Sequence, residues 1–172
     1  MMNFETVFDR LIGHEGGWSD DPRDPGNWTG GRPNVGQLKG TKFGIAANTY
    51  PDIDIKGLTL DAAKAIYRRD WWDKIHADEM PGAVAYQVWD FAVNAGMSRA
   101  VISLQRAVGV ADDGKIGPRT LAAVAAMSVT DVLSRFNAER LEFYASLSTW
   151  ATYGKGWARR VAGNLRYAAE DS

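Results

Sequence analysis

The sequence predicts a mainly helical protein with about seven helices and a small β-hairpin after the first helix. Two observations lead to this expectation. Apolar residues recur at helical spacing through most of the 172 residues, as amphipathic helices require. Residues 16–47, in contrast, contain eight glycines and three prolines. This density of helix breakers excludes a continuous helix there and favours turns with short strands.

The first expected helix ends at a carboxylate, Glu15. The apolar residues of this helix recur at spacings of three and four and are Phe4, Val7, Phe8, Leu11 and Ile12. Glu15 continues the same face, and the pair Gly16-Gly17 indicates the helix end. Partial burial and the carbonyl groups of the helix end should both raise the pKa of Glu15, which suits a general acid. The alternative is an exposed residue that merely ends an amphipathic helix.

A second carboxylate and a hydroxyl follow Glu15 within the glycine-rich segment. Asp24 lies nine positions beyond Glu15, and Thr41 precedes a short apolar run. Hydrolysis of a glycosidic bond with inversion needs an acid, a second carboxylate and a positioned water. Thr29 lies closer to Asp24 in the sequence and is an alternative to Thr41 for holding that water.

Three ordered motifs in this region carry a family resemblance. They are Glu15-Gly16-Gly17-Trp18, Asp21-Pro22-Arg23-Asp24-Pro25-Gly26 and Thr41-Lys42-Phe43-Gly44-Ile45. Together they resemble glycoside hydrolase family 108, which comprises peptidoglycan muramidases that are often phage endolysins. The resemblance implies a lysozyme-like fold, with Glu15 as the acid, Asp24 as the second carboxylate and Thr41 as the water-positioning hydroxyl. Against the family pattern, residues 27–40 read as an insertion.

Aromatic faces suit the apolar faces of sugar rings, and seven tryptophans are present. The candidates for contacts with substrate are Trp18, Trp28, Tyr67, Trp72 and Asn94. For Tyr67 and Trp72 the alternative is core packing, and for Asn94 it is a hydrogen bond to the backbone. Asp20, Asp21 and Asp24 lack the spacing of a calcium loop, so we expect neither a metal nor a cofactor.

The second half of the chain reads as further helices. We expect Thr59, Pro81, Pro118 and Thr130 at helix starts, and a last helix from about Gly156. Asp90 lies in an apolar helix and needs a partner if buried, for which an arginine from a later helix is the natural candidate. The run from Ser103 to Leu121 resembles the helical peptidoglycan-binding segment that accompanies family 108. We therefore expect a hydrolase lobe at residues 1–95 and a peptidoglycan-binding-like lobe at residues 96–172.

Composition limits the function classes. The net charge of −1 gives no reason to expect nucleic acid as a partner. The chain has no cysteine, and its charged N-terminus reads as neither a signal peptide nor a membrane anchor. We expect a monomer, without membrane insertion, that is made in the bacterial cytoplasm and reaches the cell wall through a holin or another export route.

The resemblance implies an endolysin-type N-acetylmuramidase that hydrolyses the β-1,4 bond between N-acetylmuramic acid and N-acetylglucosamine in peptidoglycan. Two alternatives stay open at this point. A lytic transglycosylase would use a comparable glutamate and release an anhydro product, although it needs no second carboxylate such as Asp24. A peptidoglycan-binding protein without turnover would keep the fold alone.

Overall fold

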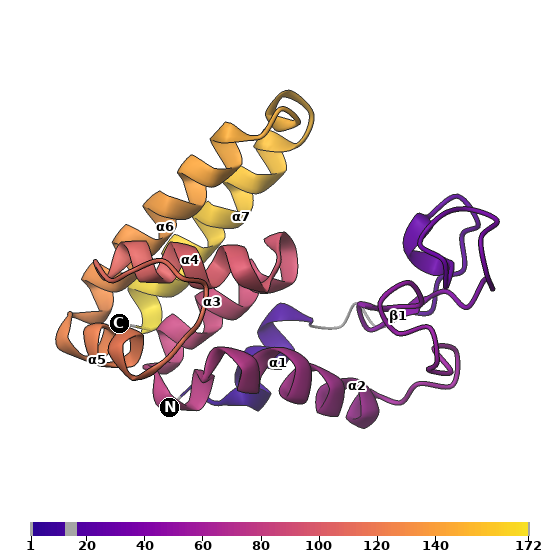
Figure 1. Cartoon of the computed structure of the whole chain (residues 1–172), viewed down its shortest axis with the longest axis horizontal. Helices are drawn as coiled ribbons and strands as arrows, with labels where there is room; N and C mark the ends of the chain where they lie inside the picture. The colour runs from indigo at the N-terminus through magenta and orange to yellow at the C-terminus, as the bar shows by residue number, and fades with distance from the viewer. Residues whose placement is uncertain (1, 13–16, 172) are drawn as a thin grey trace. The chain divides into compact units, whose positions relative to one another are not determined.

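A computed structural model describes residues 2–12 and 17–171 of the chain. The described residues form seven α-helices and one antiparallel hairpin (Figure 1). The helices are α1 (Phe4–Leu11), α2 (Leu60–Tyr67), α3 (Gly82–Ala95), α4 (Met97–Ala107), α5 (Pro118–Ala126), α6 (Val129–Ser146) and α7 (Trp150–Asp171). The strands are β1 (Thr41–Lys42) and β2 (Ile45–Ala46). The prediction of a mainly helical fold with a small hairpin is confirmed.

The chain divides into two compact units. The N-terminal unit is Phe4–Arg69, and the C-terminal unit is Asp70–Ser172 together with Met1–Asn3. This division reflects compactness alone. The boundary that the sequence motifs suggest, between residues 95 and 96, stays a prediction.

The core of the N-terminal unit forms where α1 meets α2. Phe4, Val7 and Phe8 of α1 are buried, as the helical spacing predicts. The Phe8 ring meets the edge of Tyr67 from α2 with centroids 5.7 Å apart. Thr59 starts α2, and its hydroxyl accepts a hydrogen bond from the Ala62 amide, which confirms the predicted cap. At the surface, Lys64 forms an ion pair with Glu5.

The hairpin between β1 and β2 turns through two residues with positive φ. Thr41 pairs with Ala46 and Lys42 pairs with Ile45, which leaves Phe43 (φ 51°) and Gly44 (φ 74°) in the turn. Two successive positive φ angles are typical of the turns that match strand twist in two-residue hairpins. A Cβ at position 44 would collide with the hydroxyl of Tyr67, so glycine is required there.

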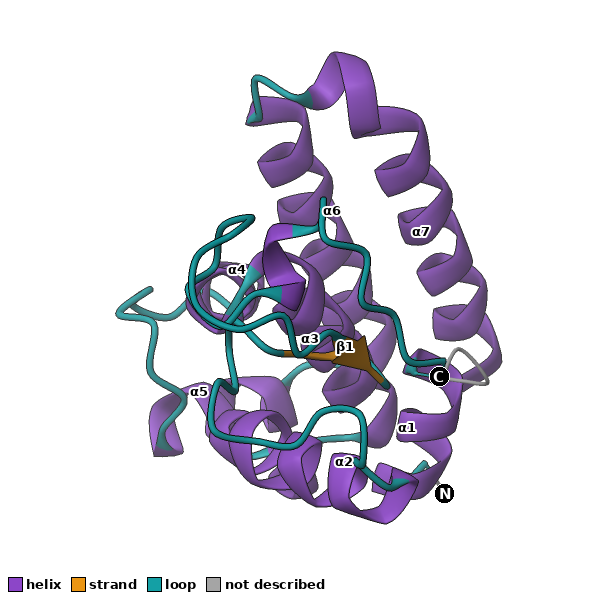
Figure 2. Ribbon diagram, turned by 90° about the vertical axis from the view of Figure 1, so that its right-hand side faces the viewer, coloured by secondary structure: helices purple, strands orange, loops and turns teal. Residues whose placement is uncertain are grey.

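The C-terminal unit is built around α3, which is buried along most of its length. α6 and α7 form a long helical hairpin and lie side by side in both views (Figure 1, Figure 2). The tip of that hairpin is held by aromatic contacts, of which the closest is the stack of Tyr144 on Trp157 at 5.0 Å. None of the described helices is both long enough and apolar enough to span a membrane.

Asp90 of α3 is buried and links α3 to α6 and α7 through hydrogen bonds and ion pairs. Its carboxylate is 2% exposed and accepts hydrogen bonds from Arg140 at 2.6 Å, Arg160 at 2.6 Å and Asn164 at 2.7 Å. The prediction of an arginine partner from the later helices is confirmed. Burial raises the pKa of Asp90, but the charge of Arg140 and the bonds from Arg160 outweigh it, so the pKa lies below its ordinary value.

Two helix starts differ from the prediction. Ser128, rather than Thr130, caps α6, because its hydroxyl accepts a hydrogen bond from the Asp131 amide. α7 begins at Trp150 rather than near Gly156. The Trp150 ring packs against the backbone at Gly154, where a Cβ would collide with it. Gly154 therefore serves close packing within a continuous helix.

Candidate functional site

The predicted general acid, Glu15, lies outside the described residues. The described chain leaves α1 through Ile12, whose amide donates to the Phe8 carbonyl, and continues from Gly17. The site can therefore be built from the segment that follows Glu15, residues 17–56, all of which belong to the N-terminal unit.

Asp24 is exposed and sits in a rigid turn. Its Oδ1 accepts a hydrogen bond from the Gly26 amide at 2.8 Å, and its own amide donates to the Asp21 carbonyl at 3.1 Å. The Arg23 guanidinium donates two hydrogen bonds to the Asp21 carboxylate, of 3.0 and 2.8 Å. These bonds lower the pKa of Asp21 to about 2. The turn thus presents the Asp24 carboxylate to solvent on a backbone that is fixed from both sides.

Asn27 ties this turn to β1. It is fully buried, and its side-chain amide donates to the Asp21 carbonyl at 3.0 Å. Its Oδ1 accepts the hydroxyl proton of Thr41 at 2.7 Å, and its carbonyl accepts the amides of Lys39 and Gly40 at 3.0 Å each. Sequence reasoning missed Asn27 and assigned it to the insertion. The available clue was an amide side chain directly after the Asp-Pro-Gly turn.

The bond to Asn27 restricts what Thr41 can do. Because the hydroxyl proton points to Asn27, the free lone pairs of Oγ1 can only accept. Thr41 could hold a water as an acceptor while that water keeps its own lone pairs for attack. This geometry suits the predicted role without testing it.

Thr29 is engaged elsewhere. Its hydroxyl oxygen accepts the Gln37 amide at 2.9 Å, and its amide donates to the Gln37 carbonyl at 3.0 Å. These bonds close residues 28–38 into a loop of their own, with Trp28 bridged to Leu38. Of the two candidate hydroxyls, only Thr41 is linked through Asn27 to the Asp24 turn, which favours Thr41.

Trp18 borders a cavity of about 380 Å³. The indole Nε1 donates to the Lys39 carbonyl at 3.2 Å, and the Lys56 ammonium lies 4.6 Å from the ring centroid. Trp18 is 37% exposed. Asp52 and Asp54 also line this cavity, so an aromatic ring and two carboxylates occur together there.

Trp28 and Tyr67 do not line that cavity; each donates a hydrogen bond to a loop carbonyl instead. The Trp28 indole donates to the Pro22 carbonyl at 2.9 Å and so holds the aspartate turn. The Tyr67 hydroxyl donates to the Phe43 carbonyl at 3.1 Å, and the side chain is 2% exposed. Burial raises the pKa of Tyr67 well above its ordinary value. For Tyr67 the structure shows the core-packing alternative.

Trp72 and Asn94 belong to the C-terminal unit. Trp72 is 2% exposed, donates to Asp78 at 2.8 Å and meets Trp89 edge-on at 5.7 Å, so it too packs in a core. The Asn94 side-chain amide donates to the Asp90 backbone carbonyl, one helical turn earlier, at 2.7 Å. This is the backbone hydrogen bond predicted as the alternative to a sugar contact. Their proposed contacts with sugar are untested.

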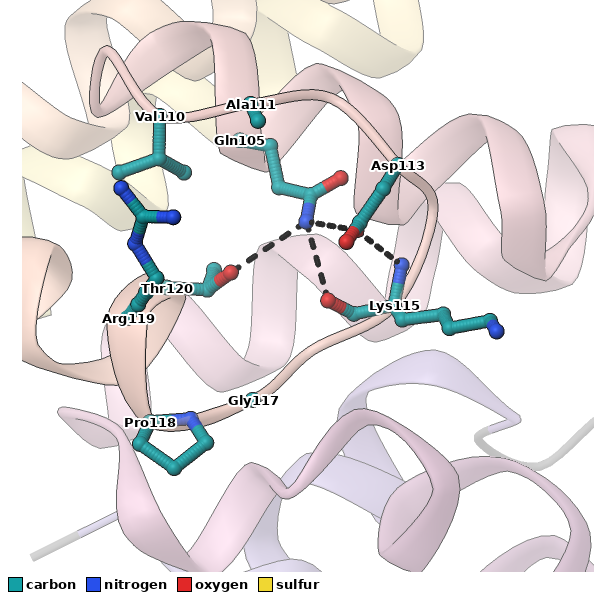
Figure 3. A pocket seen from close by; sticks show the side chains of 9 residues that line it. All are labelled: Gln105, Val110, Ala111, Asp113, Lys115, Gly117, Pro118, Arg119 and Thr120. Atoms are coloured by element: carbon teal, nitrogen blue, oxygen red, sulfur yellow. Dashed lines mark hydrogen bonds between the residues drawn. The ribbon is translucent and has the colours of Figure 1, made fainter.

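A second pocket, of about 220 Å³, lies in the C-terminal unit between α4 and α5 (Figure 3). Its centre is Gln105, which is 1% exposed. The Gln105 amide donates to Asp113 at 2.8 Å, the Lys115 carbonyl at 3.0 Å and Thr120 at 3.3 Å, and its oxygen accepts the Gly114 amide at 2.9 Å. These bonds fix the loop that precedes α5, and Pro118 begins α5 as predicted.

Comparisons with known proteins identify the family of the chain. The family model described as glycosyl hydrolase 108 matches residues 8–96, and a model described as a predicted peptidoglycan domain matches residues 99–162. The solved structure of SagA from Brucella abortus is 34% identical, covers 98% of this chain and 95% of that chain, and superposes with a TM-score of 0.80. No curated protein matches the chain. The lysozyme-like fold class is confirmed.

Proposed function

The chain belongs to the glycosyl hydrolase 108 family, and from this premise we propose that it is an N-acetylmuramidase of the endolysin type. The family and the peptidoglycan domain make it a glycoside hydrolase that acts on peptidoglycan. The bond it cleaves, in this proposal, is the β-1,4 bond between N-acetylmuramic acid and N-acetylglucosamine.

The proposal rests on the turn that carries Asp24. An exposed carboxylate, fixed by the Gly26 amide, is connected through buried Asn27 to the Thr41 hydroxyl. A carboxylate that orients a water and a hydroxyl that accepts from it are the second half of an inverting glycosidase. A transglycosylase, whose nucleophile is a hydroxyl of the sugar itself, has no need for this pair.

The proposal assigns roles to three residues. Glu15 protonates the oxygen of the leaving sugar. Asp24 stabilises the oxocarbenium-like transition state or orients the attacking water, and its carboxylate takes up the proton that this water loses. Thr41 accepts a hydrogen bond from that water. The first product is the inverted α-anomer, which proton NMR of the fresh reducing end detects. A β-anomer appearing first would make Asp24 a nucleophile.

Turnover of purified cell walls tests the proposal. Glu15→Gln should lower the rate by at least about 10²–10⁴-fold, the contribution of general acid catalysis, with little change in melting temperature. Mass spectrometry of the fragments separates hydrolysis, which adds water, from transglycosylation, which leaves an anhydro end. Wild-type-like lysis by Glu15→Gln, or anhydro products alone, would overturn the assignment.

We also propose that the protein acts on the wall after release from the bacterial cytoplasm, through a holin or another export route, and that it acts as a monomer. A culture that expresses it with and without a holin tests the first part. Lysis without any release system would contradict it.

A further inference from the structure

A third cavity, of about 390 Å³, lies in the C-terminal unit where α3 passes into α4. It is lined by residues 95–99 and by Phe143 of α6. Gly96 makes the connection with φ 94° and ψ 149°. A Cβ at Gly96 would meet no atom within 4 Å, so the backbone there borders open space that a ligand can occupy.

Arg99 is held in a fixed place at this cavity. Its guanidinium lies 4.6 Å from the centroid of the Phe143 ring. Phe143 is fixed in turn against Phe91 and Tyr144, with centroids 5.7 Å apart in both pairs. Stacking on an aromatic ring orients a guanidinium and leaves its N–H donors free in its plane.

The guanidinium of Arg99 forms no ion pair within residues 2–12 and 17–171. Arg106, in contrast, forms an ion pair with Asp112, and Arg160 forms one with Asp90. In the pocket of Figure 3, the side-chain amide of Gln105 is bonded to Asp113 and Thr120. Arg99 therefore offers an oriented, unpaired cation at the edge of a cavity that the exposed residue Ser98 also lines.

We propose that Arg99, with Ser98, binds a carboxylate of peptidoglycan in this cavity. A planar guanidinium with an adjacent hydroxyl recognises a carboxylate, and peptidoglycan carries carboxylates on its stem peptides and on unsubstituted lactyl groups. The inference rests on the proposed function for the identity of the substrate. The cavity also lies where the two family segments meet, at residues 96 and 99.

Binding of three soluble fragments tests this assignment. They are the disaccharide with its stem peptide, the disaccharide with a free lactyl carboxylate, and chitobiose, which has no carboxylate. Dissociation constants come from NMR titration, in which the Nε–H signal of Arg99 reports contact directly. Arg99→Gln should weaken binding of a carboxylate-bearing fragment by about tenfold, the scale of a hydrogen bond to a charged group, and leave chitobiose unchanged.

The two carboxylate-bearing fragments show whether Arg99 binds a stem-peptide carboxylate or a lactyl carboxylate. The fragment whose affinity falls in Arg99→Gln carries the carboxylate that Arg99 binds. Arg159→Gln is the matched control, because it removes the same charge from an exposed helix position outside the cavity and should leave all three constants unchanged. Arg99→Lys keeps the charge and should lose only part of the affinity, and it replaces Arg99→Gln if the latter unfolds.

Equal losses for all three fragments, or no loss for any, would overturn the proposal. No turnover is needed for this measurement. Failure of Glu15→Gln to stop hydrolysis would therefore remove the proposed mechanism while leaving the binding result intact.

Discussion

The two units use their aspartates in opposite ways. In the N-terminal unit, Asp24 is exposed and accepts one hydrogen bond, from an amide two residues away. In the C-terminal unit, Asp90 is buried and is held by three side chains that lie 50, 70 and 74 residues further along the chain. In the proposed mechanism, Asp24 must meet water and substrate, and it lies at the surface on a hydrogen-bonded turn. Asp90 joins helices, is removed from water, and has its charge balanced by Arg140 and Arg160.

Removing the buried charge should have the largest effect on stability. Asp90→Asn leaves Arg140, which is fully buried, without its counter-charge. Breaking one side of a buried pair costs about 3–5 kcal/mol. We expect a large loss in the free energy of unfolding, measured with urea. A loss below about 1 kcal/mol would show that the cation–π contacts of Arg140 with Phe91 and Tyr144 suffice without the carboxylate.

Acid should remove the same interaction without a mutation. The pKa of Asp90 is lower in the folded protein than in the unfolded chain, where it is about 3.9. Its contribution to stability is therefore complete above that value and declines as the pH falls through the lower, folded pKa. The melting temperature of the wild type should drop below about pH 4, and that of Asp90→Asn should drop less.

The pKa of Asp21 is also lowered, so Asp21→Asn serves as the control for that acid transition. Its carboxylate is half-buried on a surface turn, and its partner Arg23 is exposed, so this ion pair should contribute little. If Asp21→Asn flattened the acid transition as much as Asp90→Asn, the buried network would not be its source.

Asp24→Asn should show the reverse pattern, with activity lost and stability kept. Asparagine can still accept the Gly26 amide and keep the turn, but it carries no charge for the transition state. We expect wall hydrolysis to fall by about 10²-fold, the scale of losing one electrostatic contact to the transition state, and the melting temperature to stay unchanged. A fall in stability with full activity would make Asp24 a structural residue only.

The smallest effects should show whether the two units unfold together. Thr59→Ala removes a helix cap in the N-terminal unit and Ser128→Ala removes one in the C-terminal unit. Each should cost about 1 kcal/mol. If the units unfold as one, both variants lower a single calorimetric transition equally. Two transitions, each sensitive to one variant alone, would show that the units unfold separately.

Features with a local cause could be predicted from the sequence. Thr59, Pro118 and the hairpin at Thr41 follow from caps, proline geometry and turn residues, and the arginine partner of Asp90 follows from the cost of an unpaired buried charge. Ser128 was missed because two hydroxyl residues compete for one cap. The start of α7 was missed because only the packed Trp150 ring explains Gly154.

The site was less predictable, because its geometry depends on contacts between distant residues. The position of Asn27 after the Asp-Pro-Gly turn was a local clue, but it does not show that Asn27 is buried and joins the Asp24 turn to Thr41. The same holds for Tyr67 and Trp72, whose aromatic character fits a sugar contact and a core equally well. The unpaired state of Arg99 depends on which carboxylates lie near it in space, and the sequence alone does not show this.

The bonds to Asp90 also have a consequence for the order of events during synthesis. The ribosome releases α3 before residues 140, 160 and 164 have been made. Until they emerge, burying α3 would leave a lone carboxylate in an apolar environment, which is strongly unfavourable. Early closure of the nascent C-terminal unit around an incomplete chain is therefore disfavoured, and α6 and α7 are needed before α3 can be buried with its charge paired.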